Sequence, residues 1–382
     1  MNLRRILIYR AELLPPSETF IAGQTASLKR YAPWFAGLKL NKGGLVLDAE
    51  RVVTLCEGDS FLDKVRRRAY LYFGISPRFH RRVRKIAPSL IHAHFALDGS
   101  MALTIQQMLN VPMVVTLHGY DVTSRDETIA QTAFGRAYLK RRSELWRRAS
   151  LFLCVSEHIR QKALERGYPP EKLAVHRIGI DLPAAEPTAK RERMVLFVGR
   201  MVEKKGCIHL IRAMEEVEAK MPDAKLILLG DGPLRPELEK EAKTRLRNAT
   251  FLGMQPQPEV REWMRKAQIL AAPSIVARSG DAEGLPTVLC EAQAIGLPVV
   301  SFIGPGVNEA VVADETALLV RPTDEHALGE AILRLLGNDE MRARFGEAGQ
   351  KRAAECFDIR TQTALLEDKY DEVLREDARR RG

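Results

Sequence analysis

Several features that define whole classes of protein are missing from this sequence. It has only five cysteines among 382 residues, and these are widely spaced: Cys56, Cys154, Cys207, Cys290 and Cys356. An odd number of dispersed cysteines, mostly within apolar runs, excludes a disulfide framework or a cysteine zinc site and indicates reduced, buried thiols. Apolar runs such as residues 226–230 are far shorter than the ~20 residues of a membrane span. We expect no transmembrane helix, no signal peptide and a cytoplasmic protein.

The chain also lacks the compositional bias of disordered or fibrous proteins. Apolar residues make up 46% of it and charged residues 28%, which is ordinary for globular domains. Because 382 residues exceed what one hydrophobic core usually supports, we expect two domains.

Positive charge is concentrated in the first half of the chain. Residues 1–190 contain 30 Lys and Arg against 17 Asp and Glu, whereas the remainder contains 29 against 32. The segment from Lys64 to Lys85 holds nine of these basic residues, interleaved with Tyr70, Tyr72, Phe73 and Phe79. Such a segment is typical of attachment to an anionic membrane surface, and equally of a solvated helix face. Nucleic acid is the competing partner, but no helix-turn-helix, zinc-finger or RNA-binding signature supports it.

Short apolar, β-branched runs alternate with longer amphipathic segments along the chain. In the first half the runs fall at residues 6–9, 52–56, 90–95, 112–118, 151–156 and 173–178. After a stretch rich in proline and alanine the pattern restarts at residues 194–199, 224–230, 249–253, 269–274, 298–302 and 317–320. Strands that alternate with helices predict an α/β protein with two Rossmann-like, doubly wound parallel sheets.

These patterns set the predicted domain limits. We expect domains at residues 1–182 and 194–355, a linker at 183–193, and a C-terminal helical segment at 356–382 that packs across the domain junction. Ligands of doubly wound sheets bind beyond the carboxyl ends of the strands, so we also expect an interdomain cleft.

Two turns in the second half combine glycines with positive charge. In VGRMVEKKG, Arg200 and Lys205 follow a strand and precede a helix. Two cations beside exposed amides suit a diphosphate, although an ordinary surface turn would have the same appearance. In LLGDGPLR, Gly230 and Gly232 match part of a dinucleotide-binding fingerprint, but Arg235 stands where the third glycine belongs. These two glycines either approach a nucleotide or simply permit a tight turn.

The segment EGLPTVLCE carries two carboxylates eight positions apart, Glu283 and Glu291. That spacing is slightly over two helical turns, so we expect Glu283, just before a helix start, to share one helix face with Glu291. Gly284 and Pro286 suit the helix entry. A carboxylate inside an apolar helix is costly to bury unless it is paired. Glu291 is therefore expected to accept hydrogen bonds from ribose hydroxyls, or else to form a buried salt bridge.

The segments HGYD (118–121), VSEH (155–158), RIGID (177–181), VGRMVEKKG (198–206), GDGP (230–233) and EGLPTVLCEAQAIGLPVVS (283–301) occur together in this chain. In this combination the sequence resembles the retaining GT-B glycosyltransferases that share an E-x7-E signature, over nearly its whole length. The resemblance implies an N-terminal acceptor-binding domain and a C-terminal domain that binds a nucleotide-diphosphate sugar. SETFI (17–21), IHAHF and TLHGYD further resemble the subgroup that builds bacterial exopolysaccharide, capsule and colanic-acid-type repeat units.

The resemblance also implies roles for single residues. Arg200 and Lys205 would hold the donor diphosphate and Glu291 the ribose, while Glu283 and His118 would lie by the transferred sugar as catalytic residues. The other expected donor contacts are Gly230, Gly232, Gly284, Leu285, Pro286 and Thr287. The expected acceptor-side residues are Ser17, Glu18, Thr19, His94 and Asp121.

The sequence departs from the family in places and lacks one motif. Ile178 stands where the family usually has asparagine, and AELLPPSETFIAGQ replaces a glycine pair after the first strand. No D-x-D occurs, the motif that holds a divalent ion in the other major glycosyltransferase fold. His92 and His94 could be metal ligands, acceptor contacts or packed polar groups, but no nearby Cys or Glu completes a ligand set. We expect no cofactor and no metal.

The resemblance implies a retaining hexosyltransferase. It would move a sugar from a UDP- or GDP-sugar to a carbohydrate or polyprenyl-linked acceptor in bacterial polysaccharide biosynthesis, in the cytoplasm or peripherally on the inner face of the cytoplasmic membrane. The alternatives are a GT-B synthase that acts on a small soluble acceptor, and a non-catalytic sugar- or nucleotide-binding protein. The incomplete glycine fingerprint argues against a nicotinamide-dependent oxidoreductase.

Overall fold

The computed structural model describes residues 3–15, 18–41, 43–183 and 191–382. The chain divides into two compact units, one formed by Met1–Gly179 with Ile359–Gly382 and the other by Ile180–Asp358. The first unit is therefore built from both ends of the chain. Residues 184–190 of the predicted linker lie outside the described residues.

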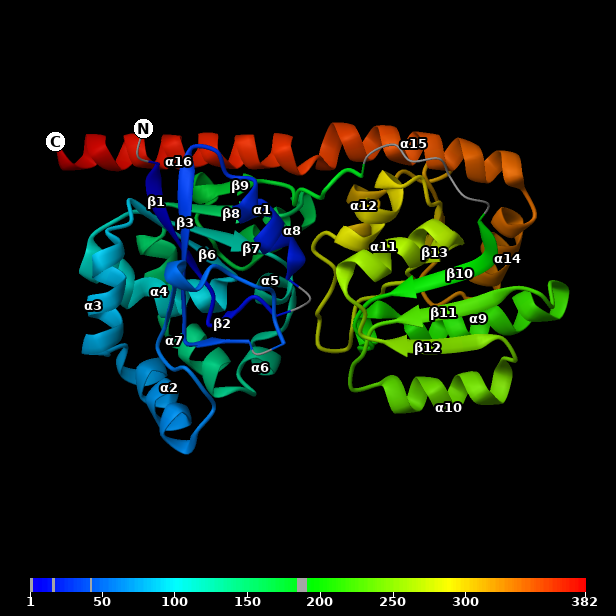
Figure 1. The fold of residues 1–382 in the computed structure, drawn as a ribbon, viewed down its shortest axis with the longest axis horizontal. Coiled ribbons are helices and arrows are strands. Elements are labelled where there is room, and N and C mark those ends of the chain that lie inside the picture. The colour runs from blue at the N-terminus through cyan, green and yellow to red at the C-terminus, as the bar shows by residue number, and fades with distance from the viewer. Residues whose placement is uncertain (1–2, 16–17, 42, 184–190) are drawn as a thin grey trace. The chain divides into compact units, whose positions relative to one another are not determined.

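The first unit is built on a seven-stranded parallel sheet with the order β5-β3-β1-β6-β7-β8-β9 (Figure 1). The strands are β1 Arg4–Tyr9, β3 Tyr31–Gly37, β5 Val52–Thr54, β6 Leu90–His94, β7 Met113–Leu117, β8 Leu151–Cys154 and β9 Leu173–Val175. A small second sheet pairs β2 Glu12–Leu13 with β4 Lys39–Leu40. The central strands are apolar on both faces because helices cover a sheet of this type on both sides.

The helices of the first unit alternate with these strands. They are α1 Thr19–Ala26, α2 Phe61–Phe73, α3 Pro77–Ile86, α4 Ala96–Leu109, α5 Tyr120–Thr123, α6 Asp126–Ile129, α7 Ala133–Arg148, α8 Glu157–Glu165 and α16 Ile359–Arg381. The last of these joins the unit from the far end of the chain, and its residues Leu366, Tyr370 and Val373 enter the same core as Ile6 and Ile8 of β1.

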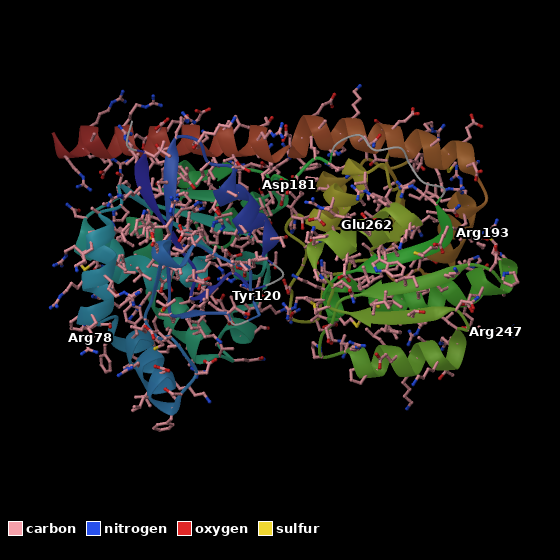
Figure 2. The ribbon with its side chains drawn as sticks, in the orientation of Figure 1. Arg78, Tyr120, Asp181, Arg193, Arg247 and Glu262 are labelled. Atoms are coloured by element: carbon pink, nitrogen blue, oxygen red, sulfur yellow. The ribbon has the colours of Figure 1, made fainter. Side chains whose placement is uncertain are left out.

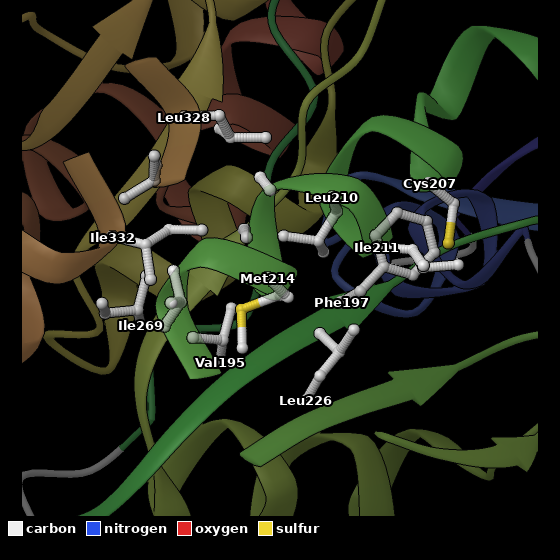
Figure 3. Close-up of a cluster of buried hydrophobic side chains, with 14 of the residues drawn as sticks. Val195, Phe197, Cys207, Leu210, Ile211, Met214, Leu226, Ile269, Leu328 and Ile332 are labelled. Atoms are coloured by element: carbon white, nitrogen blue, oxygen red, sulfur yellow. The ribbon is translucent and has the colours of Figure 1, made fainter. Parts of the chain in front are cut away.

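The second unit repeats the design with a six-stranded parallel sheet in the order β12-β11-β10-β13-β14-β15. Its strands are β10 Glu192–Val198, β11 Lys225–Leu229, β12 Ala249–Gly253, β13 Ala267–Ala271, β14 Val299–Phe302 and β15 Ala317–Val320. Its helices are α9 Cys207–Lys220, α10 Arg235–Arg245, α11 Gln257–Lys266, α12 Thr287–Ala294, α13 Val307–Ala310, α14 Glu325–Leu336 and α15 Asp339–Phe357. Figure 3 shows its core, where Val195 and Phe197 of β10 pack against α9 and α14.

The predicted parallel sheets are confirmed, and every apolar run predicted as a strand coincides with one. The sequence did not indicate β3, which lies between β5 and β1 in the first sheet. Pro33 interrupts its pattern and pairs in register with Ile6. Proline removes a ladder hydrogen bond and therefore argues against a strand inside a sheet, which explains the omission.

The helical stretch predicted at the C-terminus consists of two helices. They are separated at Asp358, whose backbone angles are not helical (φ −57°, ψ 121°). Helix α15 belongs to the second unit, whereas α16 belongs to the first. The packing of residues 356–382 across a domain junction stays a prediction. All five cysteines are free, and four of them are buried, in agreement with the sequence analysis.

Candidate active site

In the second unit, the predicted donor residues follow neighbouring strands at one edge of the sheet. Doubly wound sheets bind ligands where two adjacent strands lead the chain to opposite sides. Here that point lies between β10 and β13, since β11 and β12 lie beyond one and β14 and β15 beyond the other. Arg200 and Lys205 follow β10, and Glu283 follows β13. The structure thus brings the predicted cations and the first carboxylate to this point.

The turn after β10 presents the two cations in different ways. Arg200 is exposed, and the described part of the chain offers it no ion-pair partner. Lys205 is half-buried and lies in a short 3-10 turn that ends at Gly206, the residue before α9. Gly206 has a φ of 61° and passes so close to the carbonyl oxygen of Pro273 that a Cβ would lie 1.9 Å from it. Only glycine permits this approach of the Lys205 turn to the segment after β13.

Gly230 and Gly232 support this turn by packing beneath it. A Cβ on Gly230 would lie 2.0 Å from the carbonyl oxygen of Gly199, and one on Gly232 would lie 2.5 Å from that of Met201. The Met201 amide also donates to the carbonyl of Asp231 at 2.8 Å. The glycines therefore hold the turn after β11 against the turn after β10. This contact with backbone explains them without a ligand, and their role as donor contacts stays a prediction.

Glu283 is the buried carboxylate of the site, with 8% of its surface exposed. Its Oε1 lies 3.1 Å from Lys205 Nζ, although the contact lacks hydrogen-bond geometry and Oε1 has no hydrogen-bond partner among the described residues. Burial acts to raise the pKa of Glu283, but Lys205 and then Lys204 outweigh it and hold that pKa below its usual value. Glu283 is thus an ionised carboxylate that can still accept a hydrogen bond from a ligand hydroxyl.

Glu291 lies within α12 and is half-buried. Gln257 donates to its Oε1 at 3.4 Å, a long bond for a buried carboxylate. Burial is the main reason that the pKa of Glu291 is raised to about 7, and this effect exceeds the opposing influence of Gln257 and Arg261. Arg261 pairs instead with Asp181 at 3.1 Å. The described contacts of Glu291 therefore include no salt bridge, which was one of its two predicted interactions. The other, with ribose hydroxyls, stays a prediction.

The prediction that Glu283 and Glu291 share a helix face is wrong. Helix α12 begins only at Thr287, so Glu283 lies in the preceding loop and its direction is set by that loop. The intervening residues Gly284, Leu285 and Pro286 form the helix entry, and Pro286 provides no side-chain cap. The free amides of a first helical turn attract anions. Gly306 closes over this entry, because a Cβ there would lie 2.6 Å from the Gly284 carbonyl oxygen.

In the first unit, the histidines predicted from the sequence form a contiguous group at the carboxyl ends of β6 and β7. His94 Nδ1 and His118 Nε2 are hydrogen-bonded at 3.1 Å, and the rings of Phe20 and Phe95 lie 5.0 and 4.5 Å from that of His118. Burial lowers the pKa values of both histidines well below the usual value, so both are neutral. His118 Nδ1 has no hydrogen-bond partner among the described residues. It can therefore form a hydrogen bond with a ligand.

His92 and Asp121 have structural partners. His92 is fully buried and bonds to Tyr370 Oη at 2.6 Å and to Thr116 Oγ1 at 2.7 Å, which identifies it as a packed polar group. Asp121 is also fully buried, and its carboxylate accepts the backbone amides of Ala96, His118 and Gly119 at 2.9 to 3.2 Å. Asp121 therefore holds the loop that carries His118, and its assignment to the acceptor stays a prediction.

An ion cluster that the sequence did not indicate lies at the corresponding point of the first sheet, where β1 adjoins β6. Arg10 follows β1 and pairs with both Glu18 and Asp98, while its guanidinium lies 4.5 Å from the ring of Phe95. Asp98 also accepts the Ala11 amide at 3.1 Å. Arg10 directly follows β1 and Asp98 lies in the first turn of the helix after β6, and these positions beyond adjacent strands were the signal that could have revealed them. Of the other predicted acceptor residues, Thr19 begins α1 and Ser17 lies outside the described residues.

One group of residues among those described has metal-ligating geometry, and it is elsewhere in the second unit. Glu216, His326 and Glu330 place their ligand atoms within 4.8 Å of one another. Lys220 already pairs with Glu216 at 2.7 Å and with Glu330 at 3.7 Å. Ion pairs therefore account for this cluster without a metal.

Comparison with known proteins identifies the family. The sequence model described as "Glycosyl transferases group 1" matches residues 181–352, and the one described as "Glycosyltransferase Family 4" matches residues 41–183. WcaL of Escherichia coli, assigned as a colanic acid biosynthesis glycosyltransferase, is 30% identical over 68% of this chain and 64% of its own length. The amylovoran biosynthesis glycosyltransferase AmsK of Erwinia amylovora is 29% identical over 65% of this chain and 61% of its own length. The chain thus spans just under two thirds of these relatives.

Solved structures support the same fold. Anabaena HepE, determined in complex with UDP and glucose, superposes with a TM-score of 0.76 at 18% identity and covers 97% of this chain and 100% of its own. Sucrose-phosphate synthase from Thermosynechococcus elongatus gives a TM-score of 0.75 at 20% identity, with 98% and 100% covered. No helix among the described residues is long and apolar enough to cross a membrane. Because the two family models together match residues 41–352, the chain belongs to the group 1 and family 4 glycosyltransferases, which are retaining and have the GT-B fold.

Proposed function

We propose that this protein transfers a hexose from a UDP- or GDP-sugar to a carbohydrate or lipid-linked acceptor, with retention of configuration, in the assembly of a bacterial cell-surface polysaccharide. The observation that carries the proposal is the convergence of Arg200, Lys205 and Glu283 at the switch point of the second sheet. Next to them lies the uncapped entry of α12, followed by Glu291. A sugar nucleotide offers a diphosphate, a hexose and a ribose, and each has a matching group here.

The diphosphate suits the cationic turn. Arg200 is exposed and unpaired in the described part of the chain, so its planar guanidinium can take two phosphate oxygens. Lys205 adds a second charge next to the α12 entry. Together they would stabilise the negative charge that develops on the leaving diphosphate. This is the task that a divalent ion performs in other glycosyltransferases, and we propose that transfer here is independent of metal.

The carboxylates suit the hydroxyl-bearing parts of the donor. Glu283 has an ionised, buried oxygen without a hydrogen-bond partner in the described structure, and we assign it to the hexose. Glu291, whose only described hydrogen bond is long, is assigned to the ribose. His118 is neutral and has a free Nδ1. By its family match, we assign His118 to the hexose as well.

The transfer step follows from these assignments. The acceptor hydroxyl oxygen forms a bond to the anomeric carbon on the face from which the diphosphate departs, the bond from that carbon to the phosphate oxygen breaks, and the hydroxyl proton passes to the leaving phosphate. Glu283 holds the sugar and stabilises positive charge at the anomeric carbon. We assign Glu283 to this stabilisation and not to nucleophilic attack, since the acceptor oxygen bonds directly to the anomeric carbon and the step requires no covalent intermediate.

Relatives support the choice of substrates. HepE was determined with UDP and glucose, which favours a uridine nucleotide. WcaL and AmsK are assigned to the biosynthesis of colanic acid and amylovoran, which favours a polysaccharide repeat unit as acceptor. The free, buried cysteines are consistent with a cytoplasmic location.

Thermal stabilisation by sugar nucleotides tests the proposal. UDP-, GDP- and ADP-sugars would be compared in the presence of EDTA, with the wild type, Glu291→Ala and the control Glu259→Ala, which changes an exposed glutamate of α11. We expect one nucleotide class to raise the melting temperature of the wild type and the control, and a loss of this shift in Glu291→Ala. Stabilisation by no nucleotide, or an equal shift in Glu291→Ala, would contradict the donor site.

A further inference from the structure

Helix α2 of the first unit presents an apolar stripe to solvent. At 3.6 residues per turn its residues Phe61, Leu62, Val65, Ala69, Tyr72 and Phe73 fall on one side of the helix, within about a third of its circumference. All six are exposed, with 79% of Phe61 and 74% of Phe73 accessible, and Ile75 just beyond the helix is 69% accessible. Single exposed apolar residues are common, but a contiguous stripe marks an interaction surface.

Contacts on the opposite side of α2 hold this stripe outward. Tyr70 is 1% exposed, its ring packs edge-on against Phe79 of α3 at 5.7 Å, and its hydroxyl lies 3.3 Å from His80 Nε2. Ser60 caps the start of α2 by accepting the Asp63 amide at 3.1 Å. Gly74 ends the helix with a φ of 66°. The helix is thus capped at both ends and anchored along one side, so the exposure of its apolar side is built into the fold.

Cations lie beside the stripe on α2 and on the neighbouring helix α3. Lys64, Arg66 and Arg68 border it on α2, and every exposed residue of α3 except Pro77 is basic: Arg78, Arg81, Arg82, Arg84 and Lys85. Figure 2 marks Arg78 at the outer edge of the unit. Arg66 pairs with Asp63, but within the described structure no carboxylate pairs with Lys64, Arg68, Arg78, Arg81, Arg84 or Lys85. Cations without partners are available to an anionic surface.

We propose that α2 and α3 dock the protein onto an anionic lipid bilayer, with α2 in the plane of the interface. The stripe from Phe61 to Phe73 would enter the boundary between headgroups and acyl chains, and the cations would contact lipid phosphates. The cations supply an electrostatic attraction that salt screens, and the inserted side chains supply a second, salt-independent attraction. Nucleic acid would engage the cations but not the leucine and valine of the stripe. The proposal concerns where the chain binds and does not rest on the transfer reaction.

Vesicle flotation of the full chain tests this surface. Phosphatidylcholine vesicles would be compared with vesicles that also contain phosphatidylglycerol, at low and high salt. The test variants are Phe61→Ser/Phe73→Ser for the stripe and Arg81→Glu/Arg84→Glu for the cations. The matched controls in the second unit are Met254→Ser, which changes another exposed apolar residue, and Lys240→Glu/Lys243→Glu, which changes two exposed lysines of α10.

The wild type and both controls are expected to float with the anionic vesicles. The vesicle-bound fraction of each test variant is expected to be at most one tenth of that of the wild type. The melting temperature of each variant shows that it is folded. A Tyr72→Trp variant should gain a blue-shifted emission component on addition of anionic vesicles. The proposal is overturned if the wild type floats with neither vesicle, if the stripe variant floats like the wild type, or if the emission of the Tyr72→Trp variant stays unchanged. Salt-sensitive binding to a single-stranded RNA that persists in the stripe variant, without flotation, would instead assign the surface to nucleic acid.

Discussion

At the scale of single residues, the ionisation of Glu291 determines how strongly the proposed site can bind a ribose. A carboxylate accepts hydrogen bonds from hydroxyl groups through both oxygens, whereas a protonated carboxyl must offer one of them as a donor. Since burial raises the pKa of Glu291 to about 7, this change falls close to neutral pH. Donor affinity should therefore rise with pH.

For Glu291 we predict that the affinity for the stabilising sugar nucleotide falls about tenfold from pH 8 to pH 6, the change in the ionised fraction of a group with a pKa of about 7. Calorimetric titration would measure it, with an intact sugar nucleotide as ligand because its diphosphate does not titrate in this range. Glu291→Gln should bind weakly at both pH values. A wild-type affinity that does not vary with pH, or a Gln variant that varies as the wild type does, would refute this role.

Arg200 and Lys205 carry the same charge but differ in their surroundings. Their substitution should therefore affect donor binding alike but protein stability differently. Each replacement by alanine should weaken donor binding by about 1.5–3 kcal/mol, the contribution of a charged hydrogen bond. Arg200→Ala should leave the free energy of unfolding within about 0.5 kcal/mol of the wild type, as for other exposed residues. Lys205→Ala should lower it by about 1–3 kcal/mol, because Glu283 stays buried without its nearest cation.

Urea unfolding and nucleotide titration on the same preparations would check this pair. A double variant, Lys205→Ala/Glu283→Gln, serves as the control, since removal of the buried charge should restore part of the lost stability. If Arg200→Ala proves as destabilising as Lys205→Ala, the described difference between the two cations is wrong.

At the scale of elements, α16 completes the first unit through Glu367. This carboxylate is 3% exposed and accepts the backbone amides of Lys29 and Arg30 at 2.8 and 2.6 Å, before β3. We predict that Glu367→Ala lowers the free energy of unfolding by about 2–4 kcal/mol, since two amides and Arg30 lose a charged partner. Glu372→Ala, on the exposed side of the same helix, should change it by less than about 0.5 kcal/mol. Denaturant titration of both variants measures this contrast, and equal effects would contradict it.

The elements also show how far periodicity alone determines a fold. Strands of alternating α/β units are continuous apolar runs, so those in both sheets were predictable. β3 was not, because Pro33 breaks its pattern and its partners on β1 and β5 supply the stability. The pairing of α16 with the first unit was not predictable either, since contacts such as that between Tyr370 and His92 join residues remote in sequence.

The site shows the same division. Arg200, Lys205, Glu283 and His118 were predictable because each directly follows a strand or stands in a motif. The shared helix face of Glu283 and Glu291 was not observed, because the segment between them begins as a loop and becomes helical only at Thr287. Periodicity does not reveal the length of such a loop. Asp121 stands in a family motif, yet its three amide bonds show a structural role. Sequence thus indicates which residues reach an edge of the sheet, but only the backbone contacts show which remain available to a ligand.

At the scale of the whole molecule, each unit has its own sheet and core, whereas the cations and carboxylates assigned to the diphosphate, ribose and hexose belong to the second unit. Differential scanning calorimetry should therefore resolve two transitions, with a donor at 100 times its dissociation constant stabilising mainly the second unit by about 2.7 kcal/mol. Glu367→Ala identifies the transition of the first unit, because this substitution should lower the temperature of that transition alone. The donor should then raise the temperature of the other transition, which belongs to the second unit. An increase confined to the transition that Glu367→Ala lowers would place the nucleotide in the first unit and reverse the assignment of the two domains.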